Sequence, residues 1–93
     1  MNTRPPPPND SPVPLSAVET GATAVVHMIH GGRGLAARLA ELGIWPQVTL
    51  KVIRGGRRGP VVAEVKGGQI IIGQGMAERI LVVPLAPGPR NRS

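Results

Sequence analysis

Two histidines, His27 and His30, are the side chains of this sequence best suited to bind a transition metal. They lie in or next to an apolar stretch that predicts a β-strand over residues 22–29, and residues three apart on a strand point to opposite faces. The imidazoles therefore converge only if the strand ends or bulges between them, and Met28 and Ile29 do interrupt the apolar alternation there. His27 and His30 are candidate metal ligands, and two solvent-facing histidines at a loop edge are the alternative. Because two histidines without a third ligand make an incomplete site, we expect no resident cofactor.

The acidic and hydroxyl side chains are too scattered to support catalysis. No two carboxylates are spaced as a general acid and base would require, and the hydroxyl residues lack the sequence context of a nucleophile. The glycine pair Gly31-Gly32 lacks the lysine and the serine or threonine that hold nucleotide phosphates. We therefore expect a protein that is not an enzyme. The five acids are Asp10, Glu19, Glu41, Glu64 and Glu78.

Basic residues outnumber acidic ones by eleven to five, which gives a formal net charge of +6. Several of them fall within one predicted hairpin and its ends, where they form a candidate positive surface for an acidic partner or for phosphates. Of these, Arg54, Arg57 and Arg58 are the candidate contact residues. The basic residues of this region are Lys51, Arg54, Arg57, Arg58 and Lys66.

Trp45 is the only aromatic residue of the chain. Proteins of this size that bind single-stranded nucleic acid add several stacking aromatic rings, and grooves that bind proline-rich peptides are lined by them. One reading buries the Trp45 ring at the end of the fold. If the ring is exposed, it is the natural anchor for a protein partner, with Ile44 and Pro46 as neighbouring contacts.

The ends of the chain differ in composition from its centre. Residues 1–14 are rich in proline and bury almost nothing, which predicts a disordered tail, and residues 86–93 predict a second flexible tail. The folded domain is expected over residues 15–85. There is no cysteine to form a disulfide, and apolar runs such as Ile80 to Val83 are far too short to cross a bilayer. We expect a cytoplasmic protein that is not itself embedded in a membrane.

A short helix is predicted from about residue 34 to residue 42. Leu35, Leu39 and Leu42 recur at helical spacing, so their stripe is expected to face a core. Gly43 follows at the position that usually needs a left-handed backbone. The amides of Gly43 and Ile44 are then expected to bond to the last helical carbonyls, with Ile44 packed on Leu39.

The remaining sequence alternates with the period of two that is typical of strands. Strands are predicted from residue 22 to 29, from 48 to 53 and from 61 to 66, and over the runs 70–72 and 80–83. Turn residues separate them, notably Gly59-Pro60 and the pair Gly67-Gly68, which is expected to form a two-residue hairpin turn. Five strands with one short α-helix between the first and second predict a mainly β protein, a small and partly open barrel of the SH3-like kind.

These residues also resemble the FeoA family of ferrous iron transport proteins over positions 15 to about 84. The most specific segment runs from Arg38-Leu39 through Glu41-Leu42-Gly43-Ile44 to Pro46, and the order of the other motifs agrees with it. Those motifs are Leu15-Ser16, Gly21, Ala24, Val26, Ile29, Val52-Ile53, Gly59-Pro60, Val65, Gly67, Gly73-Gln74-Gly75-Met76-Ala77, Ile80 and Val82.

The resemblance implies a small cytosolic SH3-like protein that works beside FeoB, a membrane GTPase that carries Fe(II) inward. It implies an interaction module, either a monomer or a weak oligomer. The chain departs from the family pattern in two places. Gln47 stands where glycine is usual, so the turn after Pro46 is expected to differ in shape, and the hairpin loop from Gly55 to Gly59 is short and unusually basic. The alternative function is a nucleic-acid-binding barrel or a regulator-type domain that uses the basic hairpin.

Overall fold

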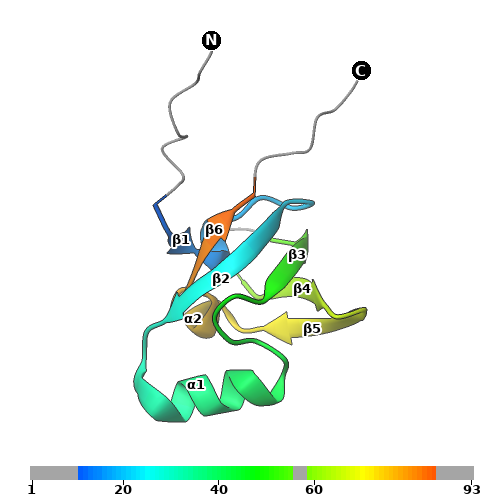
Figure 1. Cartoon of the computed structure of the whole chain (residues 1–93). Coiled ribbons are helices and arrows are strands. Elements are labelled where there is room, and N and C mark those ends of the chain that lie inside the picture. Colours follow the sequence, from blue (N-terminus) through cyan, green and yellow to red (C-terminus); the bar gives the residue numbers. More distant parts are fainter. Residues whose placement is uncertain (1–10, 56–58, 86–93) are drawn as a thin grey trace, which may run out of the picture.

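The computed structural model describes residues 11–55 and 59–85 of the chain. A curled sheet makes up most of this part, and a short helix lies across one end of it (Figure 1). Neither α-helix of the described part has the length and apolarity needed to cross a bilayer. In chain order the elements are β1 (Val13–Pro14), the 3-10 helix η2 (Leu15–Ala17), β2 (Thr23–Ile29), α1 (Gly32–Glu41), β3 (Thr49–Arg54), β4 (Val61–Val65), β5 (Gly68–Ile72), α2 (Gln74–Ala77) and β6 (Ile80–Pro84).

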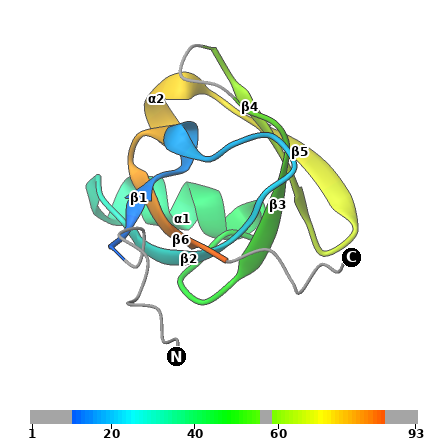
Figure 2. The same ribbon diagram turned by 90° about the horizontal axis from the view of Figure 1, so that it is seen from above.

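The sheet has six strands in the order β1-β6-β2-β3-β4-β5, and every neighbouring pair is antiparallel. The sheet curls around the core, as the view from above shows (Figure 2). It does not close into a complete barrel, because β1 and β5 are edge strands that do not pair with each other. The prediction of a mainly β, partly open SH3-like fold is confirmed. The short helix that was expected between the first two strands is α1, which lies between β2 and β3. The expected five strands become six because Val13 and Pro14, which the sequence placed in the tail, pair with Val82 and Leu81 of β6. A proline is tolerated there because an edge strand has backbone positions that need no partner.

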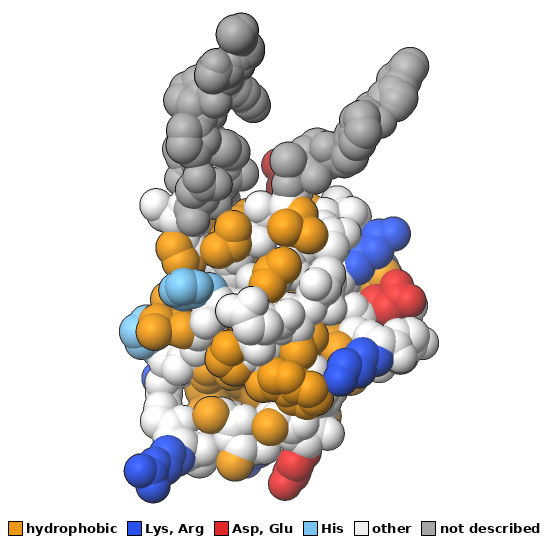
Figure 3. Space-filling view, viewed as in Figure 1, with side chains coloured by type: hydrophobic (Ala, Val, Ile, Leu, Met, Phe, Trp, Pro, Cys, Tyr) orange, Lys and Arg blue, Asp and Glu red, His pale blue; other side chains and the backbone are white. Residues whose placement is uncertain are grey.

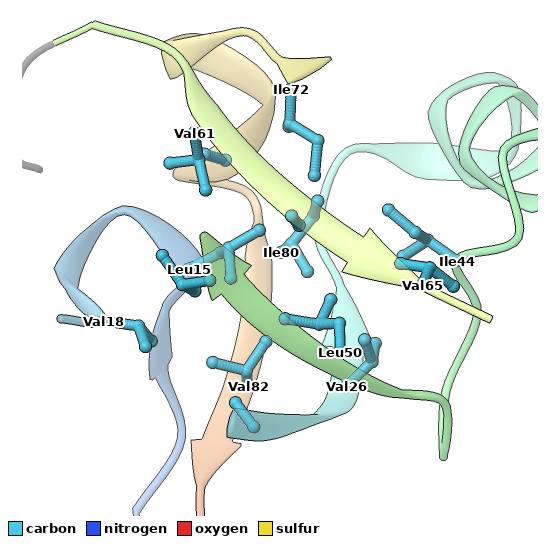
Figure 4. Packing of buried hydrophobic residues seen from close by; sticks show 14 of the residues in the cluster. Leu15, Val18, Val26, Ile44, Leu50, Val61, Val65, Ile72, Ile80 and Val82 are labelled. Carbon is cyan, nitrogen blue, oxygen red and sulfur yellow. The ribbon is translucent and has the colours of Figure 1, made fainter. Parts of the chain in front are cut away.

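The inward-facing residues of the strands form one core (Figure 4). The predicted alternation holds in β3 and β4, where Leu50, Val52 and Ala63 are buried and Lys51 is exposed. Within α1, Leu39 is the residue that is fully buried. The largest fully buried side chains are Leu15, Leu39, Ile44, Leu50, Ile72, Ile80, Val26, Val52, Val61 and Val82.

The helix ends as its sequence predicts. The Gly43 amide donates to the carbonyl of Ala40 at 3.0 Å and the Ile44 amide to that of Leu39 at 2.9 Å. Gly43 has φ +94°, a conformation that residues with a Cβ rarely adopt. The predicted apolar stripe is wrong at its last member, because Leu42 is the C-cap residue and is 42% exposed.

The hairpin between β4 and β5 turns one residue earlier than expected. Val65 pairs with Gly68, so the two turn residues are Lys66 and Gly67, with φ +53° and +85°. Two positive φ values are the mark of a type I′ turn, which suits the twist of a hairpin. The expected Gly67-Gly68 turn is therefore wrong by one position, and this shift places Lys66 at the tip.

Candidate functional site

Trp45 lies on the surface in the middle of the connection between α1 and β3 and is 42% exposed. Its neighbour Ile44 is fully buried, because its amide closes the helix end and its side chain joins the core. The prediction of Ile44 as a partner contact is therefore wrong, and its role is to hold the connection in place. Pro46 and Gln47 are exposed beside the ring.

The backbone around Trp45 forms a turn that β2 holds rigidly. The Val48 amide donates to the Trp45 carbonyl at 3.1 Å, and Gln47 at the third turn position has φ +82°. These are features of a type II turn, in which proline suits the second position and glycine the third. The Gln47 amide donates to the carbonyl of Val26 at 2.8 Å, which fixes the turn against the sheet.

The ammonium group of Lys66 lies over the Trp45 ring, 4.2 Å from the ring centroid. Such a cation–π contact contributes about 0.5–1 kcal/mol at an exposed site. It joins the turn of the β4–β5 hairpin to the turn after α1 and limits the ring's freedom. We call the exposed residues here the Trp45 patch, which consists of Leu42, Trp45, Pro46, Gln47 and Lys66.

We expect Gln47→Gly to raise stability. A non-glycine residue at φ +82° is strained, and the change removes a Cβ from a conformation that glycine adopts freely. We expect a gain of about 1 kcal/mol, a rise of roughly 4–8 °C in Tm for a domain of this size. Thermal unfolding followed by circular dichroism measures it. Thr49→Gly on the exposed face of β3 is the control and should lower Tm, and a fall in Tm for Gln47→Gly would contradict the turn assignment.

Among the described basic residues of the predicted positive surface, Arg54 and Lys66 lie apart. Arg54 at the end of β3 is opposite Val62, whereas Lys66 lies beyond the other end of β4, against Trp45. Lys51 lies between them and faces Glu64 across the strands, which offsets its charge. Arg57 and Arg58 lie outside the described residues.

His27 and His30 both reach solvent at the end of β2. The pairing of β2 with β6 shifts register between Val26 and Met28, so the bulge needed to bring the histidines to one side is present. In residues 11–55 and 59–85 no group of three or more His, Cys, Asp or Glu side chains is placed to hold a metal ion. The two histidines therefore lie on one flank without a third ligand of those types.

Comparison with known proteins gives a consistent result. The FeoA domain family matches residues 13–84. The chain is 38% identical over 78 residues to "Putative Fe(2+) transport protein A" of Methanocaldococcus jannaschii, which covers 84% of this chain and 94% of that protein. The fold is similar to the crystal structure of an iron uptake regulatory protein (FeoA), with TM-score 0.75 and 33% identity over 81% of this chain and 100% of that one. It is also similar to the solution structure of the FeoA protein from Chlorobium tepidum, with TM-score 0.71 and 27% identity over 87% of each chain.

Proposed function

The chain belongs to the FeoA family, and from that premise we propose that it is a non-enzymatic accessory protein of ferrous iron uptake. Its partner in this proposal is the cytosolic part of a FeoB-type membrane GTPase. The protein itself acts in the cytoplasm, and its functional domain is the folded part of the chain from β1 to β6.

The observation that carries the proposal is the half-exposed Trp45 ring on a rigid turn. Tryptophan is strongly enriched among the residues that dominate binding energy at protein interfaces. Here the ring is already ordered by the Lys66 contact and by the turn bonded to β2. Little conformational entropy is then lost when a partner covers it, and this favours affinity.

The placement of the acidic side chains supports a non-enzymatic role. The four acids of the described part lie on different elements, with Glu41 ending α1, Glu64 in the middle of β4 and Glu78 capping α2. Glu19 lies in the connection between η2 and β2. No two of these four carboxylates therefore belong to the same element, whereas general acid–base catalysis needs positioned groups at one site.

We expect Trp45→Ala to weaken binding to the purified cytosolic part of the transporter by about 2 kcal/mol, which is about thirty-fold in Kd. Lys66→Glu should weaken it as well, because the ring loses its cation and the surface gains a negative charge. Isothermal titration calorimetry measures both. Arg54→Glu is the matched control, since it makes the same change of charge at the far end of the β3–β4 hairpin and should leave Kd nearly unchanged.

The same variants separate this function from the alternative. If Arg54→Glu abolishes transporter binding while Trp45→Ala does not, the Trp45 patch is not the interface. If the wild type binds oligonucleotides tightly, with an affinity that falls steeply as salt rises, the protein is a nucleic-acid binder and the transporter role is wrong.

A further inference from the structure

A β-bulge in β2 changes the direction of the side chains around His27. On β6 the register steps from Val82 to Leu81, while on β2 it steps from Val26 to Met28. His27 is thus the extra residue of the bulge. A bulge places two residues of one strand opposite one residue of the other and re-aims their side chains.

Burial along β2 shows which way these side chains point. Val26 is buried, His27 and Met28 are both exposed, Ile29 packs against the core and His30 is exposed again. The strict alternation of buried and exposed side chains stops after Val26, where the register shifts. His27, Met28 and His30 therefore share the outer side of the strand.

The spacing of the three side chains suits a shared ligand. Met28 and His30 are two residues apart on one face, about 7 Å along the strand, and His27 is brought beside Met28 by the bulge. The His30 amide donates to the Arg79 carbonyl at 2.8 Å, which holds the end of this segment against the chain before β6. Figure 3 shows both histidines on the same flank of the molecule.

Two imidazoles and one thioether are a distinctive set of donors. Imidazole binds copper, zinc, iron and nickel, whereas a thioether favours soft Cu(I) over the harder divalent ions. Met28 is 42% exposed, so its thioether is accessible to an ion from solvent. We propose that His27, Met28 and His30 form a surface site for Cu(I).

The charge of the surroundings agrees with a monovalent ion. All three donors are neutral when they bind a metal, and the described residue opposite His30 is the cationic Arg79. Three neutral donors supply no negative charge, which leaves the charge of a divalent ion less well balanced than that of Cu(I). This inference does not depend on the interaction with the transporter.

The test is an anaerobic titration of the full chain with Cu(I) supplied as its bicinchoninate complex. The wild type should remove one Cu(I) per chain from the chelator. Met28→Leu keeps the size and apolarity of the side chain but removes the sulfur, and we expect it to lower Cu(I) affinity about tenfold or more. His27→Ala and His30→Ala should lower it at least as much. Met76→Leu on α2 is the matched control and should bind as the wild type does.

Zn(II) provides the second readout. Because zinc is held by the imidazoles and not by the thioether, Met28→Leu should leave Zn(II) affinity unchanged, whereas each histidine variant should lower it. X-ray absorption of the Cu(I) form should show copper–sulfur scattering that Met28→Leu removes. Three results would each overturn the proposal: Met28→Leu that binds Cu(I) like the wild type, one copper shared by two chains, or Cu(I) uptake that survives the loss of both histidines.

Discussion

We expect Leu39→Ala to destabilise the protein by about 2–5 kcal/mol, the range seen when a leucine in a closed core is truncated. Leu39 is fully buried and is the residue that ties α1 into the core. Small domains have total stabilities of only about 5–15 kcal/mol, so this loss removes a large share of the whole. Tm should fall by more than about 10 °C in thermal unfolding followed by circular dichroism.

Leu42→Ala is the control for this prediction. Leu42 is the same residue type three positions later, but it is 42% exposed at the C-cap, so its truncation leaves no closed cavity. We expect a loss of less than about 1 kcal/mol. Equal losses for the two variants would mean that α1 is not anchored through Leu39.

We expect the second large effect from Gly43→Val. At φ +94° a β-branched side chain is strongly disfavoured, and the strain alone is worth about 1–3 kcal/mol. The new Cβ would lie 3.5 Å from Cγ1 of Val65, which is an ordinary contact distance, so the expected loss comes from the backbone conformation. The midpoint of urea unfolding should fall markedly.

Two variants test whether conformation is the cause. Gly43→Asn should lose less than Gly43→Val, since asparagine enters the left-handed region more readily. Gly34→Ala in α1 should instead stabilise by about 0.5–1 kcal/mol, because nothing lies within 4 Å of the new Cβ and alanine is the better helix former. A Gly43→Val midpoint equal to that of the wild type would show that the helix end does not need a left-handed residue.

The helix end and the strand alternation were predictable because they are local. Gly43 after a leucine stripe specifies a left-handed cap within a few residues, and the Ala40 and Leu39 carbonyls accept the amides that the sequence assigned to them. The strands β3 and β4 follow from a period of two. The order of the motifs can also be read directly from the sequence, so the fold class and the family resemblance could be predicted without the structure.

The positions of the turn and the bulge were not predictable in the same way. Lys66-Gly67 and Gly67-Gly68 both contain the glycine that a primed turn favours, and the pairing of Val65 with Gly68 selects the first. Likewise, Val13 and Pro14 form a strand only because they pair with Val82 and Leu81 of β6, which lie far from them in sequence. Register is a property of two strands together, so one strand's sequence leaves it open.

The candidate sites depend on this long-range register. Lys66 lies over the Trp45 ring because the β4–β5 hairpin turns at Lys66-Gly67. Met28 lies on the same side as the histidines because the pairing of β2 with β6 has a bulge at His27. The sequence by itself determined which residue types were available, namely one tryptophan, two histidines and no cysteine. Only the tertiary structure decided which of them share a surface, because a shift of one residue in strand pairing moves a side chain from the core to solvent.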